Sequence, residues 1–364
     1  MAPHIPIIDP HHHLTFKELF DTWDSDAQPI AWPAHVHAMA GYGYKTGIAF
    51  QYLKDEMLQD TRGNNVVGTV CIEHGEHYDK GKGIFSPVGE TRYCREVFER
   101  CVRENAETKL CMGIVAHADL KLGEKVVDVV RAHEAAGGGL LKGIRHSLSC
   151  DPFCLGMICE YPREGTLLDP ADVHRFSKFR EGVSCLPRFG LTYDCWLYHT
   201  NIKALIELAR ACPSTTMVCN HVAYPIGVGP YAEKSRREEL FEHWKADLAE
   251  LATYSNVYCK VGGMTEACCM MGEPLPWASL ERETPPSSQE LAQTLAPWYL
   301  YAIETFGPRR CMFESNFPMD RGNCSYTNLW NAFKLLAKDF PSADQAALFH
   351  DTAVKVYNLP SSQL

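Results

Sequence analysis

The stretch Ile7-Ile8-Asp9-Pro10-His11-His12-His13 begins with apolar residues and ends in three histidines. In an extended strand, alternate side chains share one face, so we expect Asp9, His11 and His13 to point to one side, away from the middle histidine. Two imidazoles that converge in this way can hold one divalent metal ion or polarise one oxyanion. The stretch therefore predicts a buried strand that carries a catalytic centre at its end.

Further apolar runs follow this strand, and segments with helical spacing of apolar residues separate them; one such segment carries Leu240, Trp244 and Leu248. The runs show little polar alternation, which is typical of parallel strands covered on both faces. The repeated alternation predicts an α/β fold, a (β/α)8 TIM barrel formed by residues 1–364 as a single domain, with an open doubly wound sheet as the alternative. The expected strands are Ile5–His11, Val66–Glu73, Cys111–Ala116, Leu140–Arg145, Leu191–Trp196, Thr215–His221, Val257–Val261 and Cys311–Asn316.

Three connecting segments are longer than ordinary loops: Thr15–Asn65, His146–Gly190 and Met264–Ser288. Each follows the carboxyl end of an expected strand, which is where barrel enzymes form their active sites. We therefore expect these long βα loops to cover that face of the barrel and to shape the pocket.

The composition indicates which kinds of partner and which cellular compartment to expect. The 364 residues carry a formal net charge of −10 with no basic block, so we expect neither nucleic acid nor a membrane as a partner. No glycine-rich phosphate loop follows an early strand, so no nucleotide cofactor is expected. The 16 cysteines fall largely in apolar runs, as buried thiols of a reducing compartment do. We expect a cytoplasmic protein, with a peroxisomal location as the alternative suggested by Ser362-Gln363-Leu364. The sequence leaves open whether the protein forms an oligomer.

Five further motifs, taken in chain order after the Asp-x-His-x-His strand end, resemble the amidohydrolase superfamily. The closer likeness is to its branch of TIM-barrel metal-dependent hydrolases, which includes lactonases and, more distantly, non-oxidative decarboxylases. The likeness covers nearly the whole chain and implies an active site at the carboxyl ends of the strands. The motifs are Gly113–Leu120 for the third strand, Lys142–His146 for the fourth, Asn220–Pro225 for the sixth, Lys260–Gly263 for the seventh and Cys311–Pro318 for the eighth.

The strand ends supply candidate metal ligands and candidate acid–base groups. His11, His13 and His221 are the expected ligands of a divalent metal, with zinc preferred, and we expect His221 to close the sixth strand. A histidine buried for structural reasons is the alternative for His221. Glu73 and Asp194 are the nearest carboxylates for general acid–base catalysis, although each can equally be a structural partner.

A second set of residues is expected to bind the substrate. Arg145 ends the fourth strand, where its guanidinium can clamp a carboxylate with two hydrogen bonds or form a salt bridge at the rim. His146, His199 and Tyr224 complete this set, although His199 can equally begin the helix after the fifth strand. The clamp predicts a small substrate that is an acid.

The eighth motif departs from the family pattern at Asn316, where the resemblance implies an aspartate that takes a proton from water. Asparagine is no general base and is a weak metal ligand, so we expect weak metal binding or none, and a gain in zinc affinity in Asn316→Asp. Glu314 is the alternative source of negative charge, because two residues back on the same strand it is expected to face the same side. Glu314 and Asn316 are therefore both candidate catalytic residues.

Three functional hypotheses follow. The first is hydrolysis of a lactone, or a related cyclic ester or amide, that carries a carboxylate. The second is a lyase reaction, namely decarboxylation, dehydration or ring rearrangement, which needs a polarised substrate but no activated water and is favoured by the missing aspartate. The third is a barrel that binds a small acid without turnover, against which the paired histidines and Arg145 argue.

Overall fold

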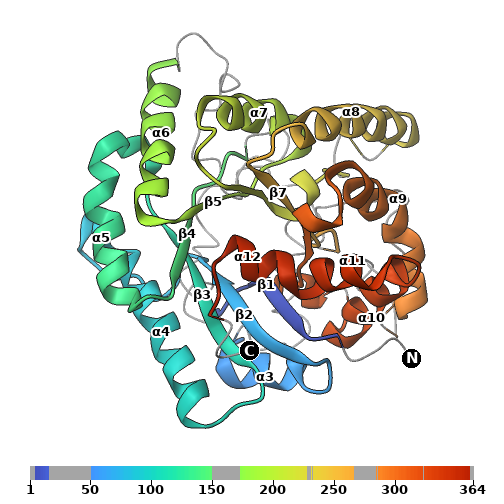
Figure 1. Ribbon diagram of the computed structural model, residues 1–364, viewed down its shortest axis with the longest axis horizontal. Helices are drawn as coiled ribbons and strands as arrows, with labels where there is room; N and C mark the ends of the chain where they lie inside the picture. The colour runs from blue at the N-terminus through green and yellow to red at the C-terminus, as the bar shows by residue number, and fades with distance from the viewer. Residues whose placement is uncertain are drawn as a thin grey trace, which may run out of the picture.

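Eight parallel strands form the centre of the computed structural model, which describes residues 5–15, 51–149, 173–227, 231, 233–265, 284, 286–322 and 324–360. The strands follow one another around the sheet in sequence order. Asn316 N donates to the carbonyl oxygen of His11 (2.9 Å) and His13 N to that of Phe317 (2.8 Å), which joins the last strand to the first. The predicted (β/α)8 barrel is thereby confirmed (Figure 1). The strands are β1 (Ile7–His12), β2 (Val66–Ile72), β3 (Lys109–His117), β4 (Leu141–Arg145), β5 (Thr192–Cys195), β6 (Met217–Cys219), β7 (Val257–Val261) and β8 (Cys311–Phe313).

Helices surround the strands on the outside of the barrel (Figure 1). Local signals set two of their ends: α9 begins with a capping box between Ser287 and Glu290, and α5 is followed by Gly138, whose φ of 56° favours glycine. The α-helices are α3 (Lys54–Thr61), α4 (Val88–Arg103), α5 (Val126–Gly137), α6 (Val173–Cys185), α7 (Ile202–Ala211), α8 (Lys234–Ala252), α9 (Ser288–Phe306), α10 (Tyr326–Ala337), α11 (Ser342–Ala346) and α12 (Thr352–Val356). Within the described ranges, none of the helices is long and apolar enough to cross a bilayer.

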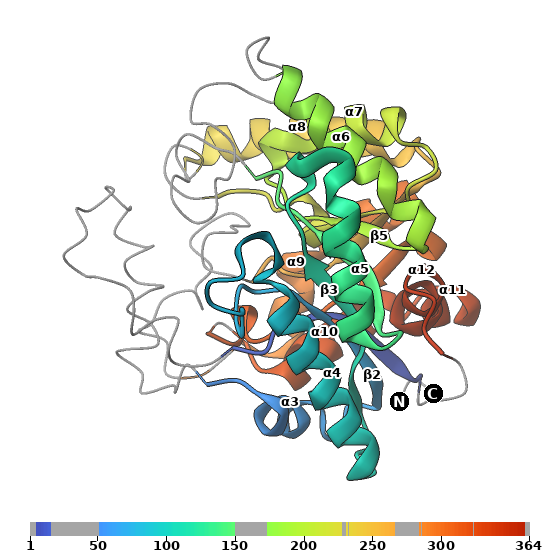
Figure 2. The same cartoon turned by 90° about the vertical axis from the view of Figure 1, so that its left-hand side faces the viewer.

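The C-terminal helix α12 covers one end of the barrel. Ala353, Tyr357 and Leu359 pack against interior side chains that include Ile8 and Val70. These two residues belong to the first half of β1 and to β2, and Figure 2 shows α11 and α12 together at this end of the molecule. The opposite end, where the strands finish, is left for the candidate site.

The first strand is not a regular alternation. Its register with β2 shifts between Asp9 and His12. The carboxylate of Asp9 accepts a hydrogen bond from the hydroxyl of Tyr326 (2.9 Å), which belongs to α10 outside the barrel. The expectation that Asp9 shares a face with His11 and His13 is therefore wrong, because a bulge breaks the period of two.

Most of the three long loops lies outside the described residues. Residues 16–50, 151–172 and 266–283 all belong to them. The expectation that these loops cover the active-site face stays a prediction.

A buried histidine between α5 and the barrel predicts how stability depends on pH. His133 accepts from Thr91 (2.7 Å) and donates to the carbonyl oxygen of His117 (3.0 Å), and burial lowers its pKa from 6.5 to about 4. In the unfolded chain, His133 binds a proton as the pH falls below 6.5. In the folded protein, His133 stays neutral until about pH 4, so the free energy of unfolding decreases across this window. Urea unfolding between pH 4 and 7 should show that the free energy of unfolding decreases less in His133→Gln than in the wild type, with a difference of about 3 kcal/mol at most. An unchanged slope would contradict this assignment.

Candidate active site

His11 and His13 meet inside the barrel, as their spacing predicts. Their Nε2 atoms are 3.2 Å apart and both side chains are buried. His13 Nδ1 lies 2.9 Å from the carbonyl oxygen of Ile72, which can only accept, so Nδ1 carries the proton and Nε2 the lone pair. Burial is the largest cause that lowers the pKa of both imidazoles well below the usual value, so both rings are neutral.

His221 lies in a left-handed turn and does not close the sixth strand as expected. β6 ends at Cys219, and the φ of His221 is 54°. The turn directs both the backbone N and the ring Nδ1 of His221 at one carboxylate oxygen, Glu314 Oε1, at 3.1 and 2.7 Å. Gly263 makes the close approach possible, because a Cβ at that position would lie 2.1 Å from His221 Nδ1.

Glu314 is the carboxylate that connects the histidines. Its Oε2 lies 2.7 Å from His11 Nδ1, but the alignment is not that of a hydrogen bond and Oε2 has no other hydrogen-bond donor. His11 Nδ1 is also 3.3 Å from Lys260 Nζ. Because the Glu314 carboxylate is nearer, we assign a proton to His11 Nδ1. Nε2 of His11 and of His221 is then the ring atom able to bind an electrophile.

This arrangement fits a divalent metal ion. Two neutral rings direct Nε2 lone pairs at each other across 3.2 Å, a repulsive contact that a cation relieves. Two nitrogen ligands of one tetrahedral zinc ion lie about 3.3 Å apart, given bonds of about 2.05 Å. In addition, the ring of His221 lies close to that of His11, with 4.6 Å between their centroids. The geometry is consistent with a divalent metal at these histidines.

Asn316 does not take the position that the sequence predicts. β8 ends at Phe313, so strand alternation does not extend to Glu314 and Asn316, and the expectation that they face the same side is wrong. Glu314 contacts the imidazoles, whereas the Asn316 amide donates to Asp320 (3.1 Å). An aspartate at position 316 would face the carboxylate of Asp320, so the gain in zinc affinity expected from Asn316→Asp does not follow.

Lys260 is the central residue that the sequence interpretation missed. Its Nζ is completely buried and donates to Asp194 Oδ2 at 2.9 Å, which also accepts from the hydroxyl of Tyr357 at 2.7 Å. The structure therefore places Asp194 in a buried ion pair rather than free beside the histidines. A lysine inside the apolar run Val257–Val261 was the available signal, whereas Tyr357 arrives from the C-terminal end of the chain without any local signal.

Lys260→Met is expected to lower the free energy of unfolding by about 3 to 5 kcal/mol, because it leaves the Asp194 carboxylate buried without its partner. The matched double variant Lys260→Met with Asp194→Asn should recover much of this loss. Denaturant unfolding of the two variants measures the difference. Equal stabilities would mean that the buried pair is not the reason for the loss.

Arg145 and Glu73 form a charged pair at the ends of β4 and β2. Arg145 Nε is 2.6 Å from Glu73 Oε1, and both side chains are largely buried. Burial alone would raise the pKa of Glu73, but the charge of Arg145, with help from two nearby histidines, brings it below its usual range. Glu73 is therefore ionised, and one edge of the guanidinium is already occupied.

The other three expected substrate-binding residues are buried in different environments. His146 Nδ1 accepts from Leu120 N (3.0 Å), and His199 Nδ1 accepts from Ile226 N (3.2 Å) in the turn before α7. The ring of Tyr224 lies 6.1 Å from that of His221. Tyr224 is thus near the histidine cluster, while contacts with substrate stay predictions for all three.

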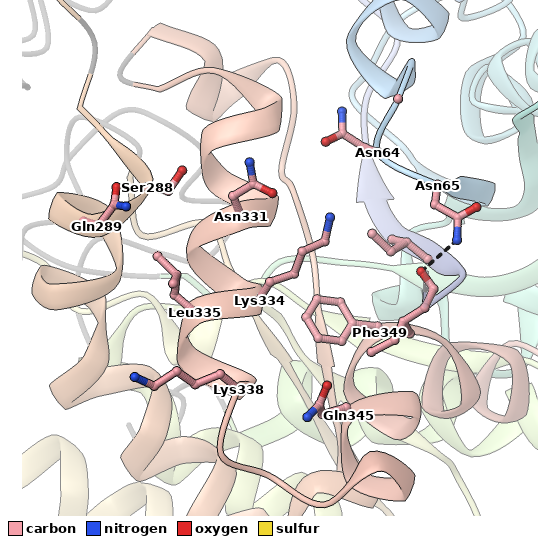
Figure 3. A pocket seen from close by; sticks show the side chains of 13 residues that line it. Asn64, Asn65, Ser288, Gln289, Asn331, Lys334, Leu335, Lys338, Gln345 and Phe349 are labelled. Carbon is pink, nitrogen blue, oxygen red and sulfur yellow. Dashed lines mark hydrogen bonds between the residues drawn. The ribbon is translucent and has the colours of Figure 1, made fainter. Parts of the chain in front are cut away.

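A pocket of about 630 Å³ lies elsewhere on the barrel. It is lined by Ile7 at the start of β1 and by Asn65 immediately before β2, with Lys334 of α10 extending toward Asn64 (Figure 3). These residues mark the amino ends of the strands. The pocket is therefore at the opposite end of the barrel from the histidines and is not the candidate active site.

The sequence of the whole chain places it in a known class. The family model described as "Amidohydrolase" matches residues 8–359, and the chain therefore belongs to the amidohydrolase family. The resemblance seen in the motifs is confirmed.

Two sequences and one crystal structure illustrate what this chain is similar to. The uncharacterized protein y4mH of Sinorhizobium fredii is 30% identical over 98% of this chain and 99% of its own length. An L-fucono-1,5-lactonase of Burkholderia multivorans is 28% identical over 53% of this chain and 61% of its own. The crystal structure of a Burkholderia multivorans amidohydrolase with bound zinc covers 98% of this chain and 100% of that one, with a TM-score of 0.66 at 20% identity, which shows a shared fold.

Proposed function

We propose that this protein hydrolyses a lactone, or a related cyclic ester, that carries a carboxylate, and that a divalent metal, preferably zinc, is held by His11, His13 and His221. The observation that carries the proposal is the pair of neutral imidazoles whose Nε2 atoms face each other at 3.2 Å, with Glu314 behind one of them. Similarity to a lactonase, and the zinc bound in a structural relative, support it.

The chain's own residues would prepare this site in two ways. Glu314 contacts the Nδ1 atoms of His11 and His221, which fixes the orientation of both rings and increases the donor strength of Nε2. Arg145 presents the free edge of its guanidinium for the acid group of the substrate. A bound metal ion would polarise the ester carbonyl and lower the pKa of water.

A lyase reaction is the second candidate, and one observation favours it. Both carboxylates expected to act in acid–base catalysis are engaged in charged pairs, Glu73 with Arg145 and Asp194 with Lys260. Decarboxylation or dehydration would need the polarised substrate without a base that activates water.

Proton release from a panel of five- and six-membered sugar-acid lactones tests the proposal. We expect turnover by the zinc-loaded protein and a rate at least about 100-fold lower in His13→Ala, since losing a ligand should cost more than the 10- to 100-fold loss typical of an outer partner. Release of carbon dioxide from aromatic acids instead would establish the lyase. Binding of acids without any turnover would refute both.

A further inference from the structure

Four side chains that the proposed reaction does not use lie close together beside β1, on the side away from His11. His12 belongs to β1, Cys71 to β2, Cys111 to β3 and Cys94 to α4, which packs against β3 (Figure 2). All four are buried. The second face of β1 thus borders a cluster of one imidazole and three thiols, which we call the thiol cluster.

The distances in the thiol cluster are those of potential ligands. His12, Cys71 and Cys111 each have a ligand atom within 4.8 Å of the others. Cys94 Sγ is 3.5 Å from Cys71 Sγ, close to the spacing of about 3.8 Å between two sulfurs bound to one tetrahedral zinc ion at 2.3 Å. It is far longer than the bond of about 2.05 Å in a disulfide.

Two features of the cluster are costly unless something binds there. The Nε2 atom of His12 contacts the Thr69 hydroxyl at 2.8 Å, but its buried Nδ1 has no hydrogen-bond partner. Cys111 adopts a φ of 56°, which is strained for a residue other than glycine, and its N–H donates to the same hydroxyl at 3.0 Å. Thr69 therefore holds both His12 and Cys111 in place.

We propose that His12, Cys71 and Cys111 bind a structural zinc ion, with Cys94 as the fourth ligand. Binding displaces the thiol protons of Cys71, Cys94 and Cys111 to solvent, and the three thiolates with the doubly positive ion leave the site with a net charge of −1. Because the site is buried, the ion enters as the chain folds. The site does not depend on the proposed function, although both use β1.

Cobalt(II) added while the full-length, metal-stripped protein refolds separates this site from the candidate active site, because the buried ion enters as the chain folds. Thiolate ligands give intense near-ultraviolet charge-transfer bands with cobalt, whereas imidazole and carboxylate ligands do not. We expect these bands to saturate at about one equivalent, to be absent when zinc replaces cobalt during refolding, and to be lost in Cys71→Ser and Cys111→Ser. Cys259→Ser is the matched control, since Cys259 is buried against another thiol, Cys219, and is expected to keep the bands.

A second measurement covers the case in which the cysteine variants fail to fold. Glu314→Gln, which is expected to weaken zinc binding at the other site, should retain about one equivalent of zinc after dialysis against a chelator that removes zinc from the histidines. Three results would overturn the proposal: wild-type protein without thiolate bands at excess cobalt, folded Cys71→Ser with unchanged bands, or Glu314→Gln without zinc. A native mass short of two hydrogens would overturn it as well, by showing a disulfide among these thiols.

Discussion

Glu314→Gln is expected to weaken zinc binding at the histidines by about 10- to 100-fold and to lower lactone turnover by a similar factor. Glutamine keeps the size of the side chain but carries no negative charge between His11 Nδ1 and His221 Nδ1, each 2.7 Å from the carboxylate. Zinc titration against a competing chelator measures the affinity, and proton release measures turnover.

Asn316→Ala is the matched control for this variant. Its amide contacts Asp320, so we expect zinc affinity to stay at the wild-type value, with some loss of stability from the missing hydrogen bond. Loss of metal from Asn316→Ala together with wild-type affinity in Glu314→Gln would transfer the anionic role away from Glu314. That result would instead support a role in metal binding for residue 316, as the family pattern implies.

Arg145→Met is expected to raise KM about 30-fold for a lactone that carries a carboxylate, since a lost charge-assisted contact costs about 2 kcal/mol. KM for a neutral lactone of the same ring size should not change. The variant also leaves Glu73 without its partner at 2.6 Å, so thermal unfolding should show a loss of stability.

The double variant Arg145→Met with Glu73→Gln separates the two effects. It should recover stability, because no unpaired carboxylate is left, while the raised KM for the acidic lactone persists. A KM that returns to the wild-type value in the double variant would mean that Arg145 serves only as the partner of Glu73.

The fold could be predicted because buried parallel strands leave a direct mark in the sequence. Runs such as Val66–Ile72 and Cys311–Phe313 are largely apolar on both faces, and their order along the chain gives the order in the barrel. The convergence of His11 and His13 could be predicted for the same reason, since two residues of one strand are related by its period.

Prediction failed where the backbone leaves the regular strand. His221 and Asn316 both have a φ of 54°, and no pattern of polar and apolar residues indicates a left-handed turn at such positions. Asp9 was misplaced because a register shift lies between it and His12.

Pairings over long distances in the sequence were equally inaccessible. Tyr357 contacts Asp194 across 163 positions, and Glu314 contacts His221 across 93. A salt bridge of Arg145 was among the alternatives that the sequence left open, because a guanidinium at a strand end serves a substrate or a neighbouring carboxylate equally well, but the sequence did not name Glu73 as its partner.

The metal dependence of lactone hydrolysis tests the central claim most directly. Protein stripped with a chelator and then reloaded with zinc should lose and regain proton release from a carboxylate-bearing lactone, because His11, His13 and His221 are proposed to act through the ion. Full turnover by the stripped protein, or no turnover of any lactone by the reloaded protein, would contradict it.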